Sequence, residues 1–261
     1  MKKVFLTFGS DNNERQHIYH ANSLSEQIKE LNLFDENNVY TGNDLINDKS
    51  FWEKHGEFIM KNKRGFGYWI WKPYLIMKEM EKLNDGDILL YLDAECKIVL
   101  EEKQYLLDYL EIVKEKKILY IFNHIEFRHL GGLPDIIMNK MDVIYNLGME
   151  NNNLIYTHQY GASVQIIYVC KETRDLTKKI YEYMCEDYHN IDDTPSIIPN
   201  HPNFYEHRHD QSLFSLLVKK NNLDSKNIIN NNNKNIINIH NIINNCIYTK
   251  GAYYNKFIKG N

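Results

Sequence analysis

The sequence predicts an α/β protein with a mainly parallel central sheet that is covered by helices on both faces. Short apolar segments rich in β-forming residues alternate along the chain with longer segments whose apolar residues recur at helical spacing. This alternation is typical of parallel strands that are buried on both faces. The length of 261 residues is sufficient for a large hydrophobic core, and we expect one main domain.

The first part of the chain shows this alternation clearly. Residues 3–8 are rich in β-forming residues and end at Gly9, which predicts a first buried strand. Pro73 suits the first turn of a helix that ends at residues 84–86, and the apolar residues 88–92 predict the next strand. Between these strands a further helix would bury one apolar side, formed by Ile18, Ala21, Leu24, Ile28 and Leu31.

The second part of the chain continues the pattern after residue 100. Residues 124–161 show a looser pattern, and a proline-containing polar loop precedes the last predicted helix. The elements predicted here are a helix over 101–117, a strand from Ile118, a strand over 164–169, a helix over 171–189 and a helix over 211–220.

The composition changes after residue 220. Residues 221–245 are dominated by Asn and Ile, which is a low-complexity bias rather than a helix or strand pattern. We therefore expect a main domain of residues 1–220 and an appendage of residues 221–261 that packs on this domain or extends from it.

Charge and cysteine content exclude several classes of protein. A net charge of −4 gives no broad basic field, so nucleic acid is not an expected partner. The four cysteines are widely spaced and form no C-x-x-C pair, which favours reduced thiols and a cytoplasmic location. No segment is apolar enough to predict a membrane span or a signal peptide. The aromatic and basic residues 248–260 suggest a peripheral membrane contact, with a solvated tail as the simpler interpretation.

Two carboxylates, Asp93 and Glu95, follow the apolar strand 88–92 directly. In open α/β sheets, ligands bind beyond the carboxyl ends of the strands, and Mg²⁺ or Mn²⁺ is often held by one or two carboxylates together with substrate phosphates. Residues two apart in a strand point to opposite faces, so both can reach one ion only if the chain turns at Ala94. The alternative is a strand end with two solvated acids.

The segment RGFGYWIWKP, residues 64–73, provides cations and aromatic rings. Arg64 and Lys72 suit phosphate groups, while Gly67 and its neighbouring glycine permit an unusual turn or a close approach to a ligand. The aromatic residues of the segment are Tyr68, Trp69 and Trp71. They could stack on a base or a sugar, and the alternative is that they anchor the hydrophobic core.

A third cluster, EHRHDQS, lies at residues 206–212 before the last predicted helix. Asp210 suits the N-cap of this helix, which alone would explain it. His207 and His209 flank an arginine ahead of the helix, and they predict a metal ligand or a phosphate contact.

These segments, together with FLTFGS near the N-terminus, resemble glycosyltransferases of the GT-A type, in a bacterial and viral polysaccharide group, over residues 4 to about 220. The resemblance implies the nucleotide-diphospho-sugar transferase fold, with Asp93 and Glu95 in place of the D-x-D signature that binds a divalent metal. Glu95 departs from that signature, which has Asp at the second position. Asp210 and Gln211 look like the Asp-Gln pair of glycogenin-like retaining transferases.

The resemblance implies a metal-dependent glycosyltransferase that moves a sugar from a nucleoside diphosphate sugar to a glycan, lipid-linked or glycoprotein acceptor, with Mn²⁺ or Mg²⁺ as the cofactor. Asp210 would be the base of an inverting enzyme, whereas Asp210 or Gln211 would face the donor sugar in a retaining one. The metal ligands implied are Asp93, Glu95, His207 and His209. The donor-binding residues implied are Phe8, Gly9, Ser10, Arg64, Gly67, Tyr68, Trp71, Lys72, Asp93 and Ala94.

Three other functions fit parts of the sequence. A sugar-nucleotide nucleotidyltransferase would need a glycine-rich basic loop after the first strand, where residues 8–15 contain one glycine. An aspartyl phosphatase would place Thr or Val after the second acid, where this chain has Cys96. A non-catalytic carbohydrate-binding or scaffold protein would keep the fold and should bind its ligand without Asp93.

Overall fold

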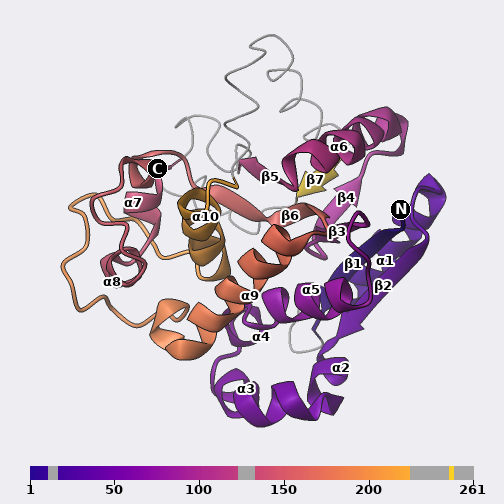
Figure 1. Ribbon diagram of the computed structural model, residues 1–261. Coiled ribbons are helices and arrows are strands. Elements are labelled where there is room, and N and C mark those ends of the chain that lie inside the picture. The colour runs from indigo at the N-terminus through magenta and orange to yellow at the C-terminus, as the bar shows by residue number, and fades with distance from the viewer. Residues whose placement is uncertain (11–16, 123–132, 224–246, 250–261) are drawn as a thin grey trace, which may run out of the picture.

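The computed structural model describes residues 1–10, 17–122, 133–223 and 247–249. Within these residues a five-stranded sheet lies between two layers of helices (Figure 1). The predicted α/β class is confirmed.

The central sheet is mixed but mainly parallel. Its strands are β1 (Lys3–Gly9), β2 (Glu36–Thr41), β3 (Ile88–Leu92), β5 (Ile118–Phe122) and β6 (Tyr160–Tyr168), in the spatial order β2-β1-β3-β6-β5. Strand β1 pairs in parallel with β2 and β3, whereas β6 pairs antiparallel with both β3 and β5. Four strands therefore run in one direction, and β6 alone among the five opposes them.

Five long helices occur where the sequence predicts them: α1 (His17–Leu31), α5 (Trp71–Glu81), α6 (Lys103–Lys116), α9 (Lys171–Glu186) and α10 (Asp210–Lys220). Further helices are α2 (Gly42–Asn47), α3 (Lys49–Lys61), α4 (Gly65–Tyr68), α7 (Asp135–Met138) and α8 (Met141–Asn146), with 3₁₀ turns at residues 100–102, 153–156 and 188–190. Among the described residues, no helix is long and apolar enough to span a membrane.

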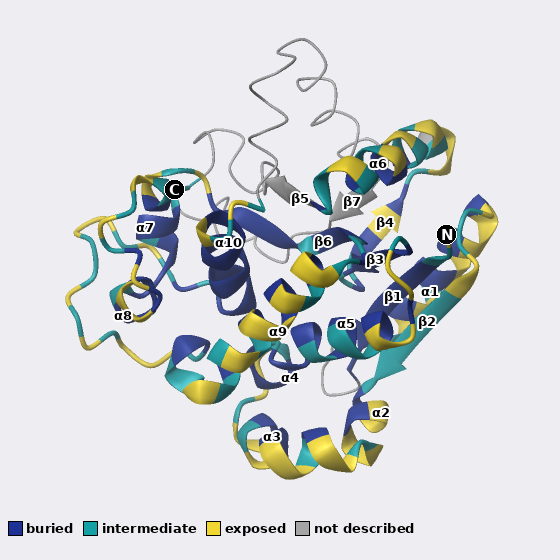
Figure 2. Ribbon diagram, viewed as in Figure 1, coloured by how far each residue is buried: buried dark blue, intermediate teal, exposed yellow. Residues whose placement is uncertain are grey.

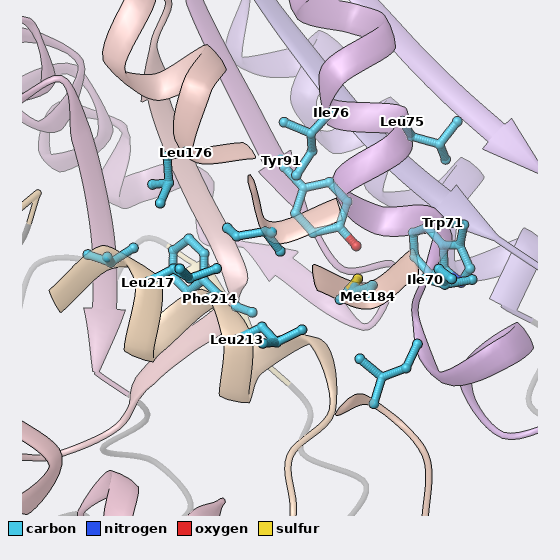
Figure 3. Close-up of a cluster of buried hydrophobic side chains, with 14 of the residues drawn as sticks. Ile70, Trp71, Leu75, Ile76, Tyr91, Leu176, Met184, Leu213, Phe214 and Leu217 are labelled. Carbon is cyan, nitrogen blue, oxygen red and sulfur yellow. The ribbon is translucent and has the colours of Figure 1, made fainter. Parts of the chain in front are cut away.

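The sheet separates two hydrophobic clusters, and β3 contributes to both. Leu89 and Tyr91 join the cluster under α5, α9 and α10, whereas Ile88, Leu90 and Leu92 join the one under α1 and α6. Figure 2 shows β1 and β3 mainly in dark blue, the colour of buried residues, and Figure 3 shows Tyr91 among side chains of the first cluster. Because both of its faces are buried, the strand is apolar at every position.

A small second sheet lies next to the carboxylate pair. Strand β4 (Cys96–Ile98) pairs antiparallel with β7 (Ile247–Thr249). A short piece of the predicted appendage therefore contacts the main domain directly after Glu95, while residues 224–246 and 250–261 lie outside the described part of the chain.

Candidate active site

The sequence segments that were singled out converge at the carboxyl ends of β1 and β3. Phe8, near the end of β1, stacks on Trp71 with ring centroids 3.9 Å apart. Trp69 stacks on His209, directly before α10, at 5.3 Å. The starts of α5 and α10 thus lie together beside the strand end that carries Asp93, as expected for a ligand site in an α/β sheet.

The centre of this site is the ammonium group of Lys72. Its Nζ lies 3.1 Å from Oδ1 of Asp93 and 2.7 Å from Oδ2 of Asp210, and 5.3 Å from the centre of the Tyr91 ring. The Lys72 side chain is only 4% exposed. With both carboxylates ionised, one buried cation stands between two anions, and the group has an excess of negative charge.

The pKa shifts follow from burial and from this charge arrangement. Burial of Lys72 acts to lower its pKa, but the charges of Asp210 and Asp93 outweigh this effect and leave the pKa raised. Burial raises the pKa of Asp210, and Lys72 offsets only part of that rise. Burial and the Asp93 charge raise the pKa of Tyr91 well above its ordinary value. Tyr91 therefore stays protonated and donates its hydroxyl hydrogen to Oδ1 of Asp93.

Asp210 is held mainly by charge. Its Oδ2 forms an ion pair with Lys72, and apart from Lys72 this oxygen has no hydrogen-bond partner among the described residues. The structure places Asp210 as the first residue of α10, with His209 in the N-cap position that we expected for Asp210. A carboxylate in the first turn is also favoured by the helix dipole.

The chain makes a turn between Asp93 and Cys96, as required if the carboxylates of Asp93 and Glu95 are to bind one metal ion. After β3, the amide of Cys96 donates to the Asp93 carbonyl at 2.9 Å, so Ala94 and Glu95 form a turn. The Asp93 side chain is 27% exposed, and both of its contacts named above are made by Oδ1. These features fit a Mg²⁺ or Mn²⁺ ion that is held by few carboxylates and completed by phosphate oxygens.

Across the described ranges, no three His, Cys, Asp or Glu side chains are grouped to hold a metal. His207 is committed to the protein, because its Nε2 donates to the Asn190 carbonyl at 2.9 Å and its Nδ1 lies 3.4 Å from the Lys140 amide. This arrangement gives no support to His207 as a metal ligand. His209 uses Nδ1 toward the Ile191 carbonyl at 2.7 Å. Burial lowers the pKa of His209 to about 4, so the ring is neutral at ordinary pH.

Gln211 is also occupied within the protein. Its Nε2 donates to Oε1 of Gln159 at 2.7 Å, and its Oε1 accepts from the Ala162 amide at 3.4 Å. The Gln211 side chain therefore links α10 to β6 by a hydrogen bond. A catalytic role for Gln211 stays a prediction.

Several residues that were predicted to bind the donor are buried or make contacts that stabilise the fold. A Cβ on Gly9 would lie 2.7 Å from the carbonyl oxygen of His17, so glycine lets β1 approach α1. Trp71 donates from Nε1 to the Gly65 carbonyl at 2.9 Å and is buried. Ser10 is buried just beyond β1. Donor contact by these residues and by Phe8 and Ala94 stays a prediction.

Residues 65–69 form a left-handed helical turn. Five consecutive residues have positive φ angles: Gly65, Phe66, Gly67, Tyr68 and Trp69. The amides of Tyr68 and Trp69 donate to carbonyls four residues earlier, at 2.8 and 3.1 Å. Each non-glycine residue in this conformation costs about 1–2 kcal/mol.

A second unusual backbone conformation lies against this turn. His209 has φ 55° and ψ −121°, and its ring packs on Trp69 and on Tyr68, the latter at 5.1 Å. Strained backbone of this kind is concentrated at functional sites, where the surrounding structure holds it in place. Two strained segments therefore flank Lys72 and Asp210 in this candidate site.

Two residues of this region were not predicted. Tyr91 lies inside an otherwise aliphatic strand, and the signal was its position two residues before Asp93, on the same side of the strand. Asp193, in the loop before α10, lies 2.7 Å from Arg64 through Oδ1 and Nη1. No sequence pattern connects residues 64 and 193, so the contact depends on the tertiary fold.

The structure is similar to three solved glycosyltransferases. One is involved in the glycosylation of the major capsid of PBCV-1, with 9% identity, a TM-score of 0.40, and coverage of 72% of this chain and 68% of that chain. Galactosyltransferase LgtC, in complex with donor and acceptor sugar analogs, has 14% identity, a TM-score of 0.40 and coverage of 80% and 68%. Mouse xyloside xylosyltransferase 1, apo form, has 10% identity, a TM-score of 0.41 and coverage of 84% and 82%.

No protein-family model and no curated protein matches the sequence. At these identities and TM-scores, the similarity concerns the fold only. No substrate and no residue role is inferred from these structures.

Proposed function

We propose that this protein is a glycosyltransferase that uses a nucleoside diphosphate sugar as donor and Mn²⁺ or Mg²⁺ as cofactor. The observation that carries the proposal is the buried Lys72 between Asp93 and Asp210, at the carboxyl end of β3. A fixed cation beside partly exposed carboxylates suits a metal-bound diphosphate, because it provides both positive charge and oxygen ligands.

The chemistry needs charge neutralisation more than proton transfer to the leaving group. Asp93 and Glu95 would hold the ion, which supplies Lewis-acid stabilisation of the departing diphosphate. Lys72 would add a second positive charge that is already in place before the reaction. Tyr91 orients the Asp93 carboxylate through its hydroxyl group.

Asp210 is the proposed catalytic carboxylate. Its raised pKa brings it closer to the range of a general base, as an inverting enzyme would require at the acceptor hydroxyl. In a retaining enzyme the same carboxylate, or Gln211, would face the donor sugar. The inverting and the retaining mechanism both require a carboxylate at the position of Asp210, beside Lys72.

The remaining assignments are proposals of the same kind. Residues 1–220 form the catalytic domain, with residues 221–261 as an appendage. The acceptor is a glycan, a lipid-linked saccharide or a glycoprotein, and the site of action is cytoplasmic or at a membrane surface.

The proposal is tested by thermal unfolding with a panel of nucleoside diphosphates and their sugar conjugates, each with and without Mn²⁺. A ligand that binds the folded state alone raises the melting temperature. We expect one nucleoside diphosphate to stabilise the protein only with metal, and Asp93→Asn to remove the metal effect. If Asp93→Asn binds the ligand as the wild type does, the non-catalytic carbohydrate-binding protein is favoured instead.

A further inference from the structure

Two segments that are far apart in the sequence contact each other beside the proposed catalytic carboxylate. Residues 64–72 lead into α5, and residues 193–210 lead from α9 into α10. Three contacts join them, and these occur in the same order along both segments. The pairs in contact are Arg64 with Asp193, Trp69 with His209, and Lys72 with Asp210.

Burial increases along this series of contacts. The side chains of Arg64 and Asp193 are 40% and 47% exposed, whereas those of Lys72 and Asp210 are only 4% and 10% exposed. The first ion pair is therefore open to solvent, and the last is shielded from it. A side chain as buried as Lys72 has almost no surface that a phosphate oxygen could contact while the segments stay in this arrangement.

Asp193 joins the two segments on the solvent side. Its Oδ1 accepts from Nη1 of Arg64 at 2.7 Å, and its side chain also accepts a hydrogen bond from the Tyr68 hydroxyl. Tyr68 packs in turn on the His209 ring, with centroids 5.1 Å apart. Exposed ion pairs are weak, and contacts of this kind can open locally without unfolding of the whole domain.

The backbone conformation of both segments opposes the closed arrangement. Residues 65–69 all have positive φ angles, and His209 has φ 55°. Strained conformations of this kind persist only while the surrounding contacts hold them. Opening at Asp193 allows the backbone to leave these conformations, which favours a local movement of the two segments over unfolding of the domain.

We propose that the contacts of Asp193 with Arg64 and Tyr68 form a latch, which keeps the two segments closed around Lys72 and Asp210 and opens to admit the diphosphate of the donor. Opening makes the ammonium group of Lys72 accessible to phosphate oxygens. The inference rests on the proposed function for the identity of the ligand, whereas the opening itself is a property of the folded chain.

Chemical labelling of lysine measures the opening in the full-length protein. The N-hydroxysuccinimide ester of acetic acid acetylates lysine amino groups that reach solvent, and mass spectrometry of the digested protein at low extents of modification gives the rate at Lys72. Lys219 is the internal reference. Its side chain is 0% exposed and pairs with Asp135, so we expect it to react only when the domain unfolds.

Two variants open the latch. Asp193→Ala removes both of its contacts, and Arg64→Gln removes the charged one. Glu172→Ala is the matched control, because the ion pair of Glu172 with Lys117 has nearly the same exposure, 48% and 40%, and lies at the amino end of β5.

We expect Asp193→Ala to raise the labelling rate of Lys72 about fivefold, the upper effect of an exposed ion pair, with Lys219 unchanged. Arg64→Gln should raise it by less, and the double variant should not exceed Asp193→Ala, since both changes act on one latch. Stopped-flow mixing with the nucleoside diphosphate that stabilises the protein, in the presence of Mn²⁺, should show association about fivefold faster in Asp193→Ala, because the open form is more populated.

The latch is overturned if Lys72 in both variants is labelled as slowly as in the wild type and the control, or if the labelling of Lys219 rises in parallel. Selective exposure of Lys72 with an unchanged association rate overturns its role in admitting the donor. The proposed function fails in a different way: if no nucleoside diphosphate binds any form but Asp193→Ala still exposes Lys72 selectively, the latch stands and the transferase assignment does not.

Discussion

Lys72 is the residue on which the charge balance of the site depends. Without it, the buried Asp210 and its neighbour Asp93 would face each other with no cation between them. We expect Lys72→Met to lower the free energy of unfolding by about 3 kcal/mol, because it leaves an uncompensated buried charge. Denaturation in urea measures this loss.

A lysine on the same helix provides the control. Lys78 is 39% exposed and pairs with Asp48, so Lys78→Met should cost no more than about 1 kcal/mol. Equal stability of the two variants would contradict the description of Lys72 as a buried central cation.

For individual residues, the sequence predicts which side chains belong to the site better than it predicts which of them contact one another. Lys72, Asp93 and Asp210 were singled out because cations and carboxylates occur at the ends of predicted elements, and the structure brings these three together. The role of His207 could not be predicted, since its partners Asn190 and Lys140 lie 17 and 67 residues away along the chain. Sequence spacing shows which residues share an element, but not which elements meet.

Among the elements, the left-handed turn at residues 65–69 is the most sensitive to substitution. A Cβ on Gly67, which has φ 83°, would lie 2.6 Å from Cγ1 of Ile59. We expect Gly67→Ala to cost at least about 2 kcal/mol, from the backbone conformation and the steric contact together. Thermal or urea unfolding measures the cost.

The substitution Gly42→Ala is the control for Gly67→Ala. A Cβ there would meet the Phe66 ring at 3.3 Å, and its φ lies outside the left-handed region. Gly42→Ala should therefore cost less than about 1 kcal/mol. A Gly67→Ala protein as stable as Gly42→Ala would show that the turn is not strained as described.

Several elements that the sequence did not predict lack a clear local pattern. Strand β2 has the sequence ENNVYT and lies at the edge of the sheet, half-buried or exposed, so no apolar alternation marks it. Helices α7 and α8 are four and six residues long, which is too short for a periodic pattern. The antiparallel direction of β6 is not encoded in its apolar sequence, because direction depends on the connections around it.

For the whole molecule, buried neutral histidines predict sensitivity to acid. Burial lowers the pKa of His55 to about 4, and its two ring nitrogens contact the hydroxyl groups of Tyr188 and Tyr181 at 2.8 Å each. The unfolded chain binds a proton there below about pH 6.5 and the folded chain does not. The stability is therefore complete above pH 6.5 and is lost progressively as the pH falls from 6.5 to 4. His207 and His209 shift in the same direction.

Urea unfolding between pH 7.5 and 5 tests this expectation. His55→Gln should be less stable than the wild type at pH 7.5, because it disturbs both tyrosine contacts. It should also lose less stability on acidification, since one titrating group has been removed. A parallel pH dependence of variant and wild type would exclude His55 as a cause of acid lability.

The overall architecture was predictable because each face of the sheet needs a helical layer. The apolar strand 88–92 and the amphipathic helices around it predict a sheet buried on both sides, and the two clusters on either side of β3 confirm it. The function follows less directly, because a fold of this class hosts many activities. The proposal therefore depends on the site around Lys72.

The most direct test is to measure the release of nucleoside diphosphate from sugar nucleotides by the purified protein, with Mn²⁺ or Mg²⁺. The account predicts that one sugar nucleotide is split in a metal-dependent reaction, that Asp93→Ala and Asp210→Asn lower the rate at least about 100-fold while remaining folded, and that Lys78→Met does not. If no sugar nucleotide is split under any of these conditions, or if Asp93→Ala works as fast as the wild type, the account is contradicted.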